Sequence, residues 1–520
     1  MDNRDTKAIL EYHEVTKHSE RSVRSNRHVL DWENQPLPLK VYRDLDPIPL
    51  VRDFPDKGDS ALEAMARTPR PAAGEAEEER IPDLTVLSRV LKLSAGITRS
   101  RRHAAGTVYF RAYPNTGALH HVDLYLVVGE LPGLSSGVYH FGPQDFALRC
   151  LREGDWRGVL VEASGNNPDL ARAPVIVVSA STYWRNSWKY QARAWRHCFW
   201  DAGTMHANLL AVAETENLEP RLVLGWADRP VERLLALDPM REGALTMVSL
   251  GRCLRPPPTA PDVPELRYET ELLSSTEIDY PEIRAAHAAS SLADAAEAVA
   301  WRGGIPARQE TAATDSQQIV LRPLPDGDLP PESLDRLIVR RGSTRAFDAG
   351  RSITFEELST VLDRAIRGVD ADFLEPPSAT LLDLYLIVNA VDGLAPGAYH
   401  YRPAERSLVL LREGDFRETA GRLGLGQLLP AAAAVNIYSL VDLAGVLERF
   451  GNRGYRAAQI EGGILGGRLY LAAYAQRIGA TGLTFFDDEV VDFFSPHAAG
   501  KNVMFLVAIG HANRATQGPG

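Results

Sequence analysis

Apolar positions along the first 255 residues follow two periods, and each period predicts a different kind of element. Ala61–Ala66 and Leu84–Leu93 carry apolar side chains at a spacing of three to four residues, which predicts helices. Predominantly apolar runs at Val122–Val128, Val175–Ser179 and Ala244–Gly251 predict buried strands. Helices and strands are therefore interspersed in an α+β order.

Shorter signals complete the elements predicted for this part. The dipeptide Pro132-Gly133 predicts a hairpin that leads into Gly137–Phe141. A turn-rich loop at Arg111–His120 opens onto the first strand, and an apolar helix runs through Asn208. A short N-terminal helix is expected at Lys7–His18.

The second half of the chain repeats the first at a fixed offset of 260 residues. The sequence GVYHF at 137–141 recurs as GAYHY at 397–401, and LREGD at 151–155 recurs unchanged at 411–415. The same offset joins Asp123–Leu126 to Asp383–Leu386, Arg193–Arg196 to Arg453–Arg456, and Asp201–Gly203 to Glu461–Gly463. Chance does not keep one register over such a span. The pattern predicts an internal duplication whose two copies pack as a two-fold pair.

The duplication divides the chain into four segments. Residues 1–60 form a polar N-terminal segment, and 61–255 form the first domain. Residues 256–330 are proline-rich and predict a linker with one alanine-rich helix near 285–301. Residues 331–515 form the second domain, so we expect an intramolecular pseudo-dimer, and further homodimerisation stays open.

Composition narrows the class of protein. The chain has 520 residues, of which 45% are hydrophobic and 24% charged, as is usual for soluble globular proteins. No apolar run reaches the roughly 18 residues of a membrane span, and no secretory signal is visible. A net charge of −11 without a basic motif argues against nucleic-acid binding. Three scattered cysteines and 13 histidines without zinc-type spacing predict no metal and a cytoplasmic location.

The second copy carries a candidate anion site that the first copy lacks. The helix predicted at Ser333–Val339 runs into Arg340, Arg341, Ser343, Thr344 and Arg345. Planar guanidinium groups beside short hydroxyls suit a phosphate. The first copy has prolines at the matching place, at 69 and 71. The alternative interpretation is a solvated basic helix end.

The first copy carries a loop that the second copy lacks. It consists of Pro114, Asn115, Thr116 and Gly117. Gly117 permits close approach of the backbone to a flat ligand, and Asn115 and Thr116 can form hydrogen bonds with ring heteroatoms. The second copy is three residues shorter here and has no glycine in the loop.

The first copy also holds an adjacent lysine and tyrosine, Lys189 and Tyr190, near three tryptophans, Trp184, Trp188 and Trp195. Aromatic surroundings predict a partly dry pocket, in which an ammonium and a phenol can handle protons. The same positions of the second copy hold Arg449 and Phe450, and neither exchanges a proton near neutral pH. A surface lysine beside a packing tyrosine is the alternative, but this asymmetry favours a catalytic pair.

Together, the Arg-Arg-x-Ser-x-Arg run, the Pro-x-x-Gly loop before a Leu-Tyr-Leu-Val strand and the glycine-bearing helix resemble the nitroreductase-like flavoproteins. Within that group the chain is most similar to the SagB-type dehydrogenases of thiazolines and oxazolines. This similarity rests on Tyr12–Ser19, the Gly-x-Tyr-His hairpin and the Lys-Tyr pair before Arg193–Arg196. The resemblance covers most of residues 10–515.

The resemblance implies two nitroreductase-like α/β sandwich domains that pair around FMN. It implies that the FMN phosphate is bound by Arg340, Arg341, Ser343 and Arg345, with a weaker contribution from Arg514. The isoalloxazine edge would lie against Pro114, Asn115, Thr116 and Gly117, and its N5 side near Thr481, Gly482 and Leu483. Asn208 matches the asparagine of the Gln-Asn pair that the family carries on the following helix. The resemblance assigns proton transfer to Lys189 and Tyr190.

Three departures from the family pattern bear on the substrate more than on FMN. The loop reads Pro-Asn-Thr-Gly instead of Pro-Ser-x-Gly, Trp195 replaces a tyrosine, and Ala207-Asn208 replaces Gln-Asn. The surviving motifs of the two copies complement each other. We therefore predict one competent flavin site per chain and a second, degenerate one.

Three functions remain open at this point. The first is an FMN-dependent dehydrogenase or oxidase that aromatises a thiazoline- or oxazoline-type ring in a peptide or peptide-like natural product. The second is an FMN- and NAD(P)H-dependent, nitroreductase-like oxidoreductase acting on another small molecule. The third is a non-catalytic binding or scaffold protein with a decayed flavin site.

Overall fold

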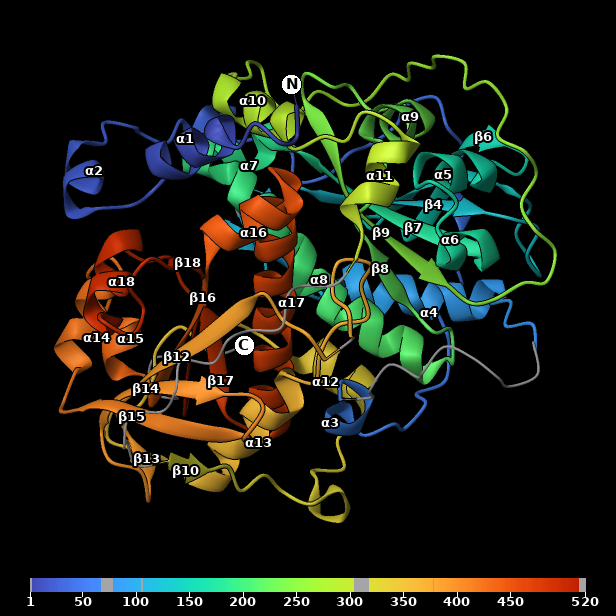
Figure 1. Cartoon of the computed structure of the whole chain (residues 1–520). Helices are drawn as coiled ribbons and strands as arrows, with labels where there is room; N and C mark the ends of the chain where they lie inside the picture. Colours follow the sequence, from blue (N-terminus) through green and yellow to red (C-terminus); the bar gives the residue numbers. More distant parts are fainter. Residues whose placement is uncertain (1, 67–77, 104–105, 304–317, 377, 514–520) are drawn as a thin grey trace.

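Two seven-stranded antiparallel sheets form the scaffold of the protein (Figure 1). The computed structural model describes residues 2–66, 78–103, 106–303, 318–376 and 378–513. The first sheet has the order β1 (Ile48–Pro49), β6 (Ala147–Glu153), β5 (Gly137–Gly142), β4 (Val122–Val128), β7 (Val175–Thr182), β9 (Glu242–Leu250), β8 (Arg221–Val223). The second has the order β10 (Gln318–Val320), β15 (Ser407–Glu413), β14 (Gly397–Arg402), β12 (Leu382–Val388), β16 (Val435–Val441), β18 (Asn502–Gly510), β17 (Gly479–Gly482). The two orders correspond strand for strand, which confirms the predicted duplication.

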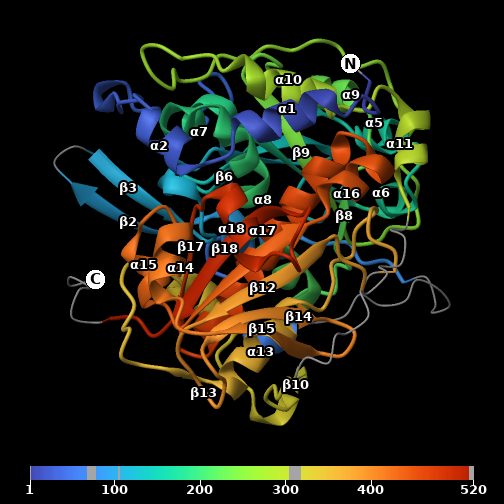
Figure 2. The same cartoon turned by 60° about the vertical axis from the view of Figure 1, so that its left-hand side comes forward.

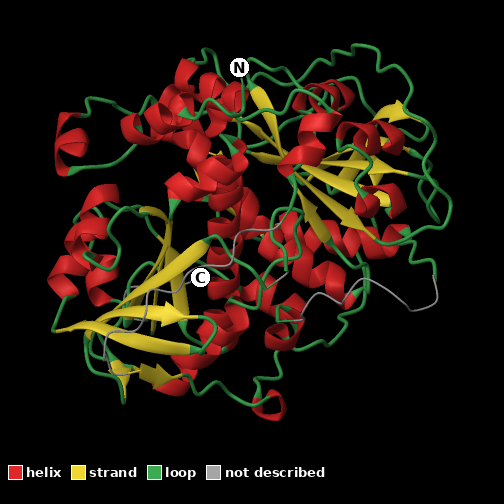
Figure 3. Cartoon of the chain, viewed as in Figure 1, coloured by secondary structure: helices red, strands yellow, loops and turns green. Residues whose placement is uncertain are grey.

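Most helices also occur twice, and they cover the sheets and fill the space between them (Figure 3). The pairs are α1 (Lys7–Val15) with α10 (Pro281–Ala289), α3 (Ala61–Ala64) with α12 (Leu334–Arg340), α4 (Leu84–Ala95) with α13 (Phe355–Ala365), α5 (Arg157–Ala163) with α14 (Arg417–Leu423), α6 (Pro168–Arg172) with α15 (Leu428–Ala432), α7 (Tyr183–Tyr190) with α16 (Leu443–Phe450), α8 (Ala194–Thr215) with α17 (Arg453–Ala475), and α9 (Asp228–Leu234) with α18 (Asp487–Phe494). Within the described ranges, α2 (Glu20–Ser25) and α11 (Ala295–Trp301) have no counterpart.

Helices α8 and α17 join the two domains. Almost every residue of both helices is buried, because each packs against its own sheet and against the other helix. At their crossing, a Cβ atom built on Gly203 would lie 2.6 Å from the Cα atom of Gly463. Only glycine allows backbones to approach so closely. The two copies therefore pack as the predicted pair.

A buried charge cluster holds the N-terminal segment and the second domain onto α8. Arg193 and Arg196 form ion pairs with Asp487 at 3.0 and 2.6 Å. Arg196 also donates to the carbonyl oxygen of His13 and to the hydroxyl of Thr16, at 2.6 and 3.0 Å. Three separate segments of the chain thus meet at one buried carboxylate.

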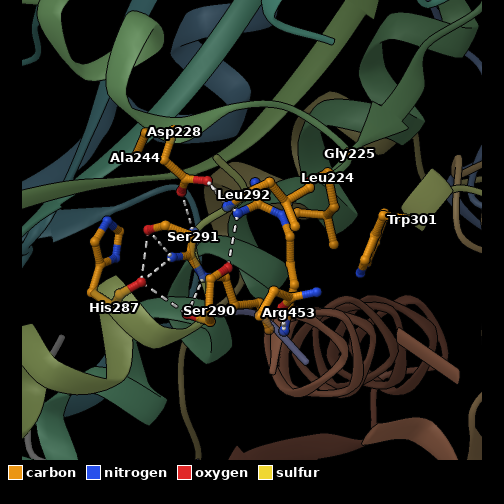
Figure 4. A network of polar contacts seen from close by, with 12 residues as sticks. Leu224, Gly225, Asp228, Ala244, His287, Ser290, Ser291, Leu292, Trp301 and Arg453 are labelled. Carbon is orange, nitrogen blue, oxygen red and sulfur yellow. Dashed lines mark hydrogen bonds and ion pairs between the residues drawn. The ribbon is translucent and has the colours of Figure 1, made fainter. Parts of the chain in front are cut away.

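The same cluster recurs at the other end of the domain interface (Figure 4). Arg453 and Arg456 form ion pairs with Asp228 at 2.6 and 2.7 Å. Arg456 donates to the carbonyl oxygen of His287 and to the hydroxyl of Ser290, at 2.7 and 2.8 Å. His287 and Ser290 therefore occupy the places of His13 and Thr16. The repeated unit includes the N-terminal helix as well as the sheet domain.

Residues 256–330 contain more structure than a linker with one helix. They supply α10 to the charge cluster, α11 to the interface and β10 to the second sheet. The single helix expected near 285–301 is two helices, because Ser290 and Ser291 turn their hydroxyls back onto α10 carbonyl groups. Asp294 then caps the start of α11 by accepting from the amide of Glu297.

The structure contains elements that were not predicted, among them a pair of strands. Strands β2 (Ile97–His103) and β3 (Gly106–Arg111) form a two-stranded ribbon that projects from the first domain (Figure 2). No helix within the described ranges combines the length and apolar character needed to cross a membrane.

Candidate active site

Tyr190 stands at the C-terminal end of α7, where the chain leaves the helix through a residue with positive φ, Gln191. A Cβ atom built on Gly117 would lie 2.9 Å from the Tyr190 hydroxyl, so the phenol lies against the glycine of the predicted loop. The ring also contacts the edge of His197, with 4.6 Å between ring centroids. The structure therefore brings together two features that the sequence places 73 positions apart.

The charges around Tyr190 come from both domains. Burial raises the pKa of Tyr190, the carboxylate of Asp201 raises it further, and the guanidinium of Arg345 opposes both. The phenol therefore stays protonated near neutral pH. Because Arg345 belongs to the second domain, residues of both domains influence the pKa of this tyrosine.

Lys189 is half-buried beside this phenol. Its ammonium lies 5.3 Å from the centroid of the Tyr190 ring. Among the residues that the structure describes, the Lys189 ammonium has no hydrogen-bond or ion-pair partner. A cation without a fixed partner next to a neutral phenol is free to engage a ligand.

The loop of Pro114–Gly117 is fixed on α8. The amide of Thr116 donates to Asp201 at 2.9 Å, and the Thr116 hydroxyl donates to the same carboxylate at 2.7 Å. The Thr204 hydroxyl donates to the carbonyl oxygen of Pro114 at 2.6 Å. Gly117 has φ +65°, which glycine adopts without strain. The side-chain oxygen of Asn115 is buried and has no hydrogen-bond partner in the described part of the chain.

Asn208 lies behind this loop and not at its ligand-facing side. Its amide donates to the carbonyl oxygens of Leu93 and Ala112, at 3.1 and 2.8 Å. Asn208 therefore positions the chain that leads into the loop.

The three arginines of the second domain's anion segment, residues 340–345, differ in their contacts. Arg340 forms an ion pair with Glu332 at 2.7 Å and donates to the carbonyl oxygen of Tyr474. Arg341 crosses to the first domain, where it donates to the carbonyl oxygen of Ala112 at 3.2 Å, and its Nε is buried without a partner among the described residues. Arg345 is exposed and has no carboxylate partner in the described ranges. Arg341 and Arg345 thus remain for an anion, while Arg340 is neutralised.

The hydroxyl of Tyr470 links the anion segment to β17. It lies 3.4 Å from the Ser343 hydroxyl and accepts a hydrogen bond from the amide of Gly482. The amide of Leu483 donates to the carbonyl oxygen of Leu506, and Thr481 is paired within the sheet. The Tyr470 hydroxyl therefore brings Ser343 and Gly482 together, and Arg514 lies outside the described residues.

Sequence reasoning missed two side chains that organise this place, Asp201 and Tyr470. Asp201 had a signal, because it aligns with Glu461 in the repeat, and Glu461 binds the hydroxyl of Thr380 as Asp201 binds Thr116. Tyr470 had no such signal in the sequence, because a tyrosine in a mainly apolar helix is not unusual.

In the second copy, the place that corresponds to the surroundings of Tyr190 is filled by side chains of the protein itself. Trp301 is 1% exposed, and its indole donates to the carbonyl oxygen of Phe450, which corresponds to Tyr190. The carboxylate of Asp372 accepts from the amides of Leu224 and Gly225, both at 2.9 Å. Burial raises the pKa of Asp372 to about 6. Side chains thus occupy the space beside Phe450 and the amides of the adjoining strand end.

Asp228, Glu232 and His287 have ligand atoms within 4.8 Å of one another (Figure 4). Two guanidinium groups already bind the Asp228 carboxylate. Their charges oppose a cation at the same place, so the cluster serves the domain interface.

Comparison with known proteins agrees with this architecture. Residues 77–252 and 338–511 each match the nitroreductase family. A putative nitroreductase from Anabaena variabilis has a similar structure, with a TM-score of 0.77 and 26% sequence identity over 97% of this chain and 99% of that one.

Among curated relatives, the trifolitoxin-processing protein TfxB of Rhizobium leguminosarum bv. trifolii is 27% identical over 32% of this chain and 47% of its own length. The microcin B17-processing protein McbC of Escherichia coli is 26% identical over 25% of this chain and 49% of its own. The putative nitroreductase MJ1384 of Methanocaldococcus jannaschii is 26% identical over 32% of this chain and 80% of its own. The matches thus span about half the length of TfxB and McbC. The family matches cover most of both repeats, and the chain belongs to the nitroreductase family, with two copies of the family domain in one polypeptide.

Proposed function

We propose that the protein is an FMN-dependent dehydrogenase that oxidises a thiazoline- or oxazoline-type ring in a peptide or peptide-like natural product. The observation that carries the proposal is the contact of Tyr190 with Gly117 in the first domain, together with Arg341 of the second domain, which donates to the carbonyl oxygen of Ala112 in the segment that leads into the Gly117 loop. Relatives named as processing proteins of trifolitoxin and microcin B17 support a peptide substrate.

The residues around Tyr190 fit a flavin mononucleotide. Arg341 and Arg345 provide positive charge that no described carboxylate neutralises, and Ser343 adds a hydroxyl donor, as a phosphate requires. Gly117 lets the Tyr190 phenol lie directly against the loop, beside the place proposed for the flat ring. The unpartnered oxygen of Asn115 can accept a hydrogen bond from an imide N–H. Asn208 and Arg340 take positioning roles instead of direct contacts in this proposal.

Aromatisation of an azoline removes a hydride from one ring carbon and a proton from its neighbour. FMN, when bound, supplies the two-electron chemistry by accepting the hydride. Lys189 and Tyr190 supply the proton chemistry. The neutral phenol of Tyr190 donates a hydrogen bond that orients the ring, and Lys189 is the proposed acceptor of the proton.

The test is the oxidation of a synthetic peptide with one thiazoline ring by the purified, flavin-loaded protein. Mass spectrometry should show the loss of two hydrogen atoms per ring, together with ultraviolet absorbance of the aromatic product. An unchanged peptide mass under multiple turnover conditions, with flavin bound, contradicts the proposal.

A second candidate is an NAD(P)H-dependent reductase, because two of the similar proteins are named putative nitroreductases. Rapid anaerobic bleaching of the bound flavin by NADPH would favour this function. Bleaching by the azoline peptide but not by NADPH favours the first. A protein that binds no flavin at all would favour the scaffold interpretation.

A further inference from the structure

The ribbon of β2 and β3 is an open pair of strands. Arg99 pairs with Phe110, Ser100 with Tyr109, Arg101 with Val108 and Arg102 with Thr107. Within the described ranges no third strand joins the ribbon. A sheet edge that is not covered presents unpaired amide and carbonyl groups, to which an extended peptide can add.

The ribbon lies in a segment of this acidic protein in which every charged residue is basic. Between Asp83 and Asp123 the sequence contains no Asp or Glu, but it contains six Lys and Arg residues, against a net charge of −11 for the whole chain. Two of the six are buried and bonded inside the protein, Arg89 to Asp335 and Arg111 to a backbone carbonyl. Arg99, Arg101 and Arg102 are exposed, and no described carboxylate pairs with them.

Apolar groups alternate with these charges. The guanidinium of Arg99 lies 4.4 Å from the centroid of the Phe110 ring. Val108, opposite Arg101, is 40% exposed. One face of the ribbon therefore offers cations and apolar contacts in the two-residue period of a strand.

The ribbon leads directly into the candidate active site. Strand β3 ends at Arg111, three residues before Pro114. Arg341 of the second domain donates to the carbonyl oxygen of Ala112 at 3.2 Å, and a ring nitrogen of His120 lies 2.8 Å from the carbonyl oxygen of Tyr109. The base of the ribbon is thus fixed at the place where both domains meet. Between α13 and β12 of the second copy, the described residues form no such ribbon.

We infer that the ribbon docks an extended, acidic segment of the peptide substrate as an added strand, next to the ring that is oxidised. Backbone pairing would align the segment, and Arg99 and Arg101, which share one face of the ribbon, would bind its carboxylates. This inference rests on the proposed function, since it assigns the substrate a recognition segment.

The test uses the flavin-loaded full-length protein and a fluorescein-labelled decapeptide of alternating Glu and Val. Fluorescence anisotropy should show binding that weakens about tenfold when Arg99→Gln, Arg101→Gln and Arg102→Gln are combined, as expected for the loss of two exposed ion pairs and of a third positive charge nearby. A control with Arg229→Gln, Arg233→Gln and Arg255→Gln removes the same charge elsewhere on the first domain and should change affinity less than about twofold.

Two further peptides separate charge from strand pairing. A decapeptide of alternating Glu and Pro keeps the charge but cannot donate backbone hydrogen bonds at its prolines, and one of alternating Gln and Val keeps the strand pattern without charge. Both should bind more weakly than the Glu-Val peptide. Equal binding of the Glu-Pro peptide, or equal losses in the two triple variants, overturns the inference.

Other occupants would also overturn it. Tighter binding of a single-stranded oligonucleotide through the same arginines would make the ribbon a nucleic-acid surface. A dimer that the ribbon variant abolishes would make it a contact between copies. Peptide binding without azoline oxidation would refute the proposed function alone, whereas oxidation with an unchanged KM in the ribbon variant would refute the docking alone.

Discussion

Burial and the Asp201 carboxylate of its own domain raise the pKa of the Tyr190 phenol, and the Arg345 guanidinium of the other domain opposes both. The protonation state of the phenol therefore depends on residues of both domains. Gly117 leaves room for the hydroxyl, since any larger residue would place a Cβ atom 2.9 Å from it. Two segments that are distant in the sequence, the Gly117 loop and the end of α7, therefore determine the position of the phenol.

The second copy provides the substitutions that test the proton-handling pair. Lys189→Arg and Tyr190→Phe convert the first copy into the residues of the second, Arg449 and Phe450. Loss of general acid–base catalysis should lower kcat for azoline oxidation about 10²–10⁴-fold, with little change in flavin content. Stopped-flow flavin reduction by the substrate measures the step.

Tyr268→Phe is the matched control, because its hydroxyl bonds a carbonyl oxygen of β6 and lies outside the candidate site. It should leave the rate unchanged. Full activity in both Lys189→Arg and Tyr190→Phe would remove the pair from the mechanism.

The two arginines of the anion segment should differ in their effect on FMN. Arg345→Ala should weaken FMN binding about 10- to 100-fold, as expected when a charged hydrogen-bonding group is lost from a phosphate. Arg340→Ala should have a smaller effect, because Glu332 already neutralises Arg340. Isothermal titration of the apoprotein gives both affinities.

Riboflavin, which lacks the phosphate, is the control ligand. Its affinity should be the same in the parent protein and in Arg345→Ala. An equal loss for FMN and riboflavin would place Arg345 away from the phosphate.

At the scale of elements, apolar strands were predicted closely and charged ones were missed. Val122–Val128 coincides with β4 residue for residue, because a strand buried on both faces is apolar at nearly every position. Ile97–His103 carries three arginines and a histidine, so its sequence has no strand period, although it forms β2. The helix expected at 285–301 was broken by serine hydroxyls that compete for backbone carbonyl groups.

The candidate site could be predicted in part for the same reason. The Pro114–Gly117 loop and the Lys-Tyr pair stood out as differences between two copies of one sequence. The ion pair of Arg340 with Glu332 could not be predicted, because it depends on how α12 packs. Asn208 matched the family pattern, but its hydrogen bonds to the carbonyl oxygens of Leu93 and Ala112 could be found only in the structure.

The paired charge clusters predict a matched loss of stability. Asp487→Asn and Asp228→Asn each leave two buried arginines without a countercharge, which should cost about 3–5 kcal/mol of unfolding free energy. Urea unfolding at neutral pH measures the loss. Asp488→Asn is the control, since its pairing with Lys17 is exposed and should contribute less than about 1 kcal/mol.

The clusters also give stability a pH dependence. Burial by itself raises the pKa of Asp487, but Arg193 and Arg196 outweigh it and hold the pKa below its ordinary value. A carboxyl with a lowered folded-state pKa contributes stability above its unfolded pKa of about 3.9 and loses it as pH falls further. The parent protein should therefore lose stability below about pH 4 more steeply than Asp487→Asn. Parallel pH profiles of the two proteins would contradict this assignment.

At the scale of the whole molecule, the proposed flavin site divides one task between the two copies. The first copy keeps the loop and the proton-handling pair, and the second keeps the arginines. The corresponding place in the second copy, beside Phe450, is filled by side chains of the protein. Trp301 lies beside Phe450, and Asp372 accepts hydrogen bonds from the amides of Leu224 and Gly225. A flavin site needs both a ring-binding and a phosphate-binding part, so the chain should retain one such site.

The most direct test of this account is the number of FMN molecules bound per chain. Apoprotein titrated with FMN, with free and bound flavin separated by equilibrium dialysis, should saturate at one FMN per polypeptide, and Arg345→Ala should weaken that single site. Saturation at two FMN per chain would contradict the division of the site between the two copies, and the absence of any saturable binding would contradict the flavin site itself.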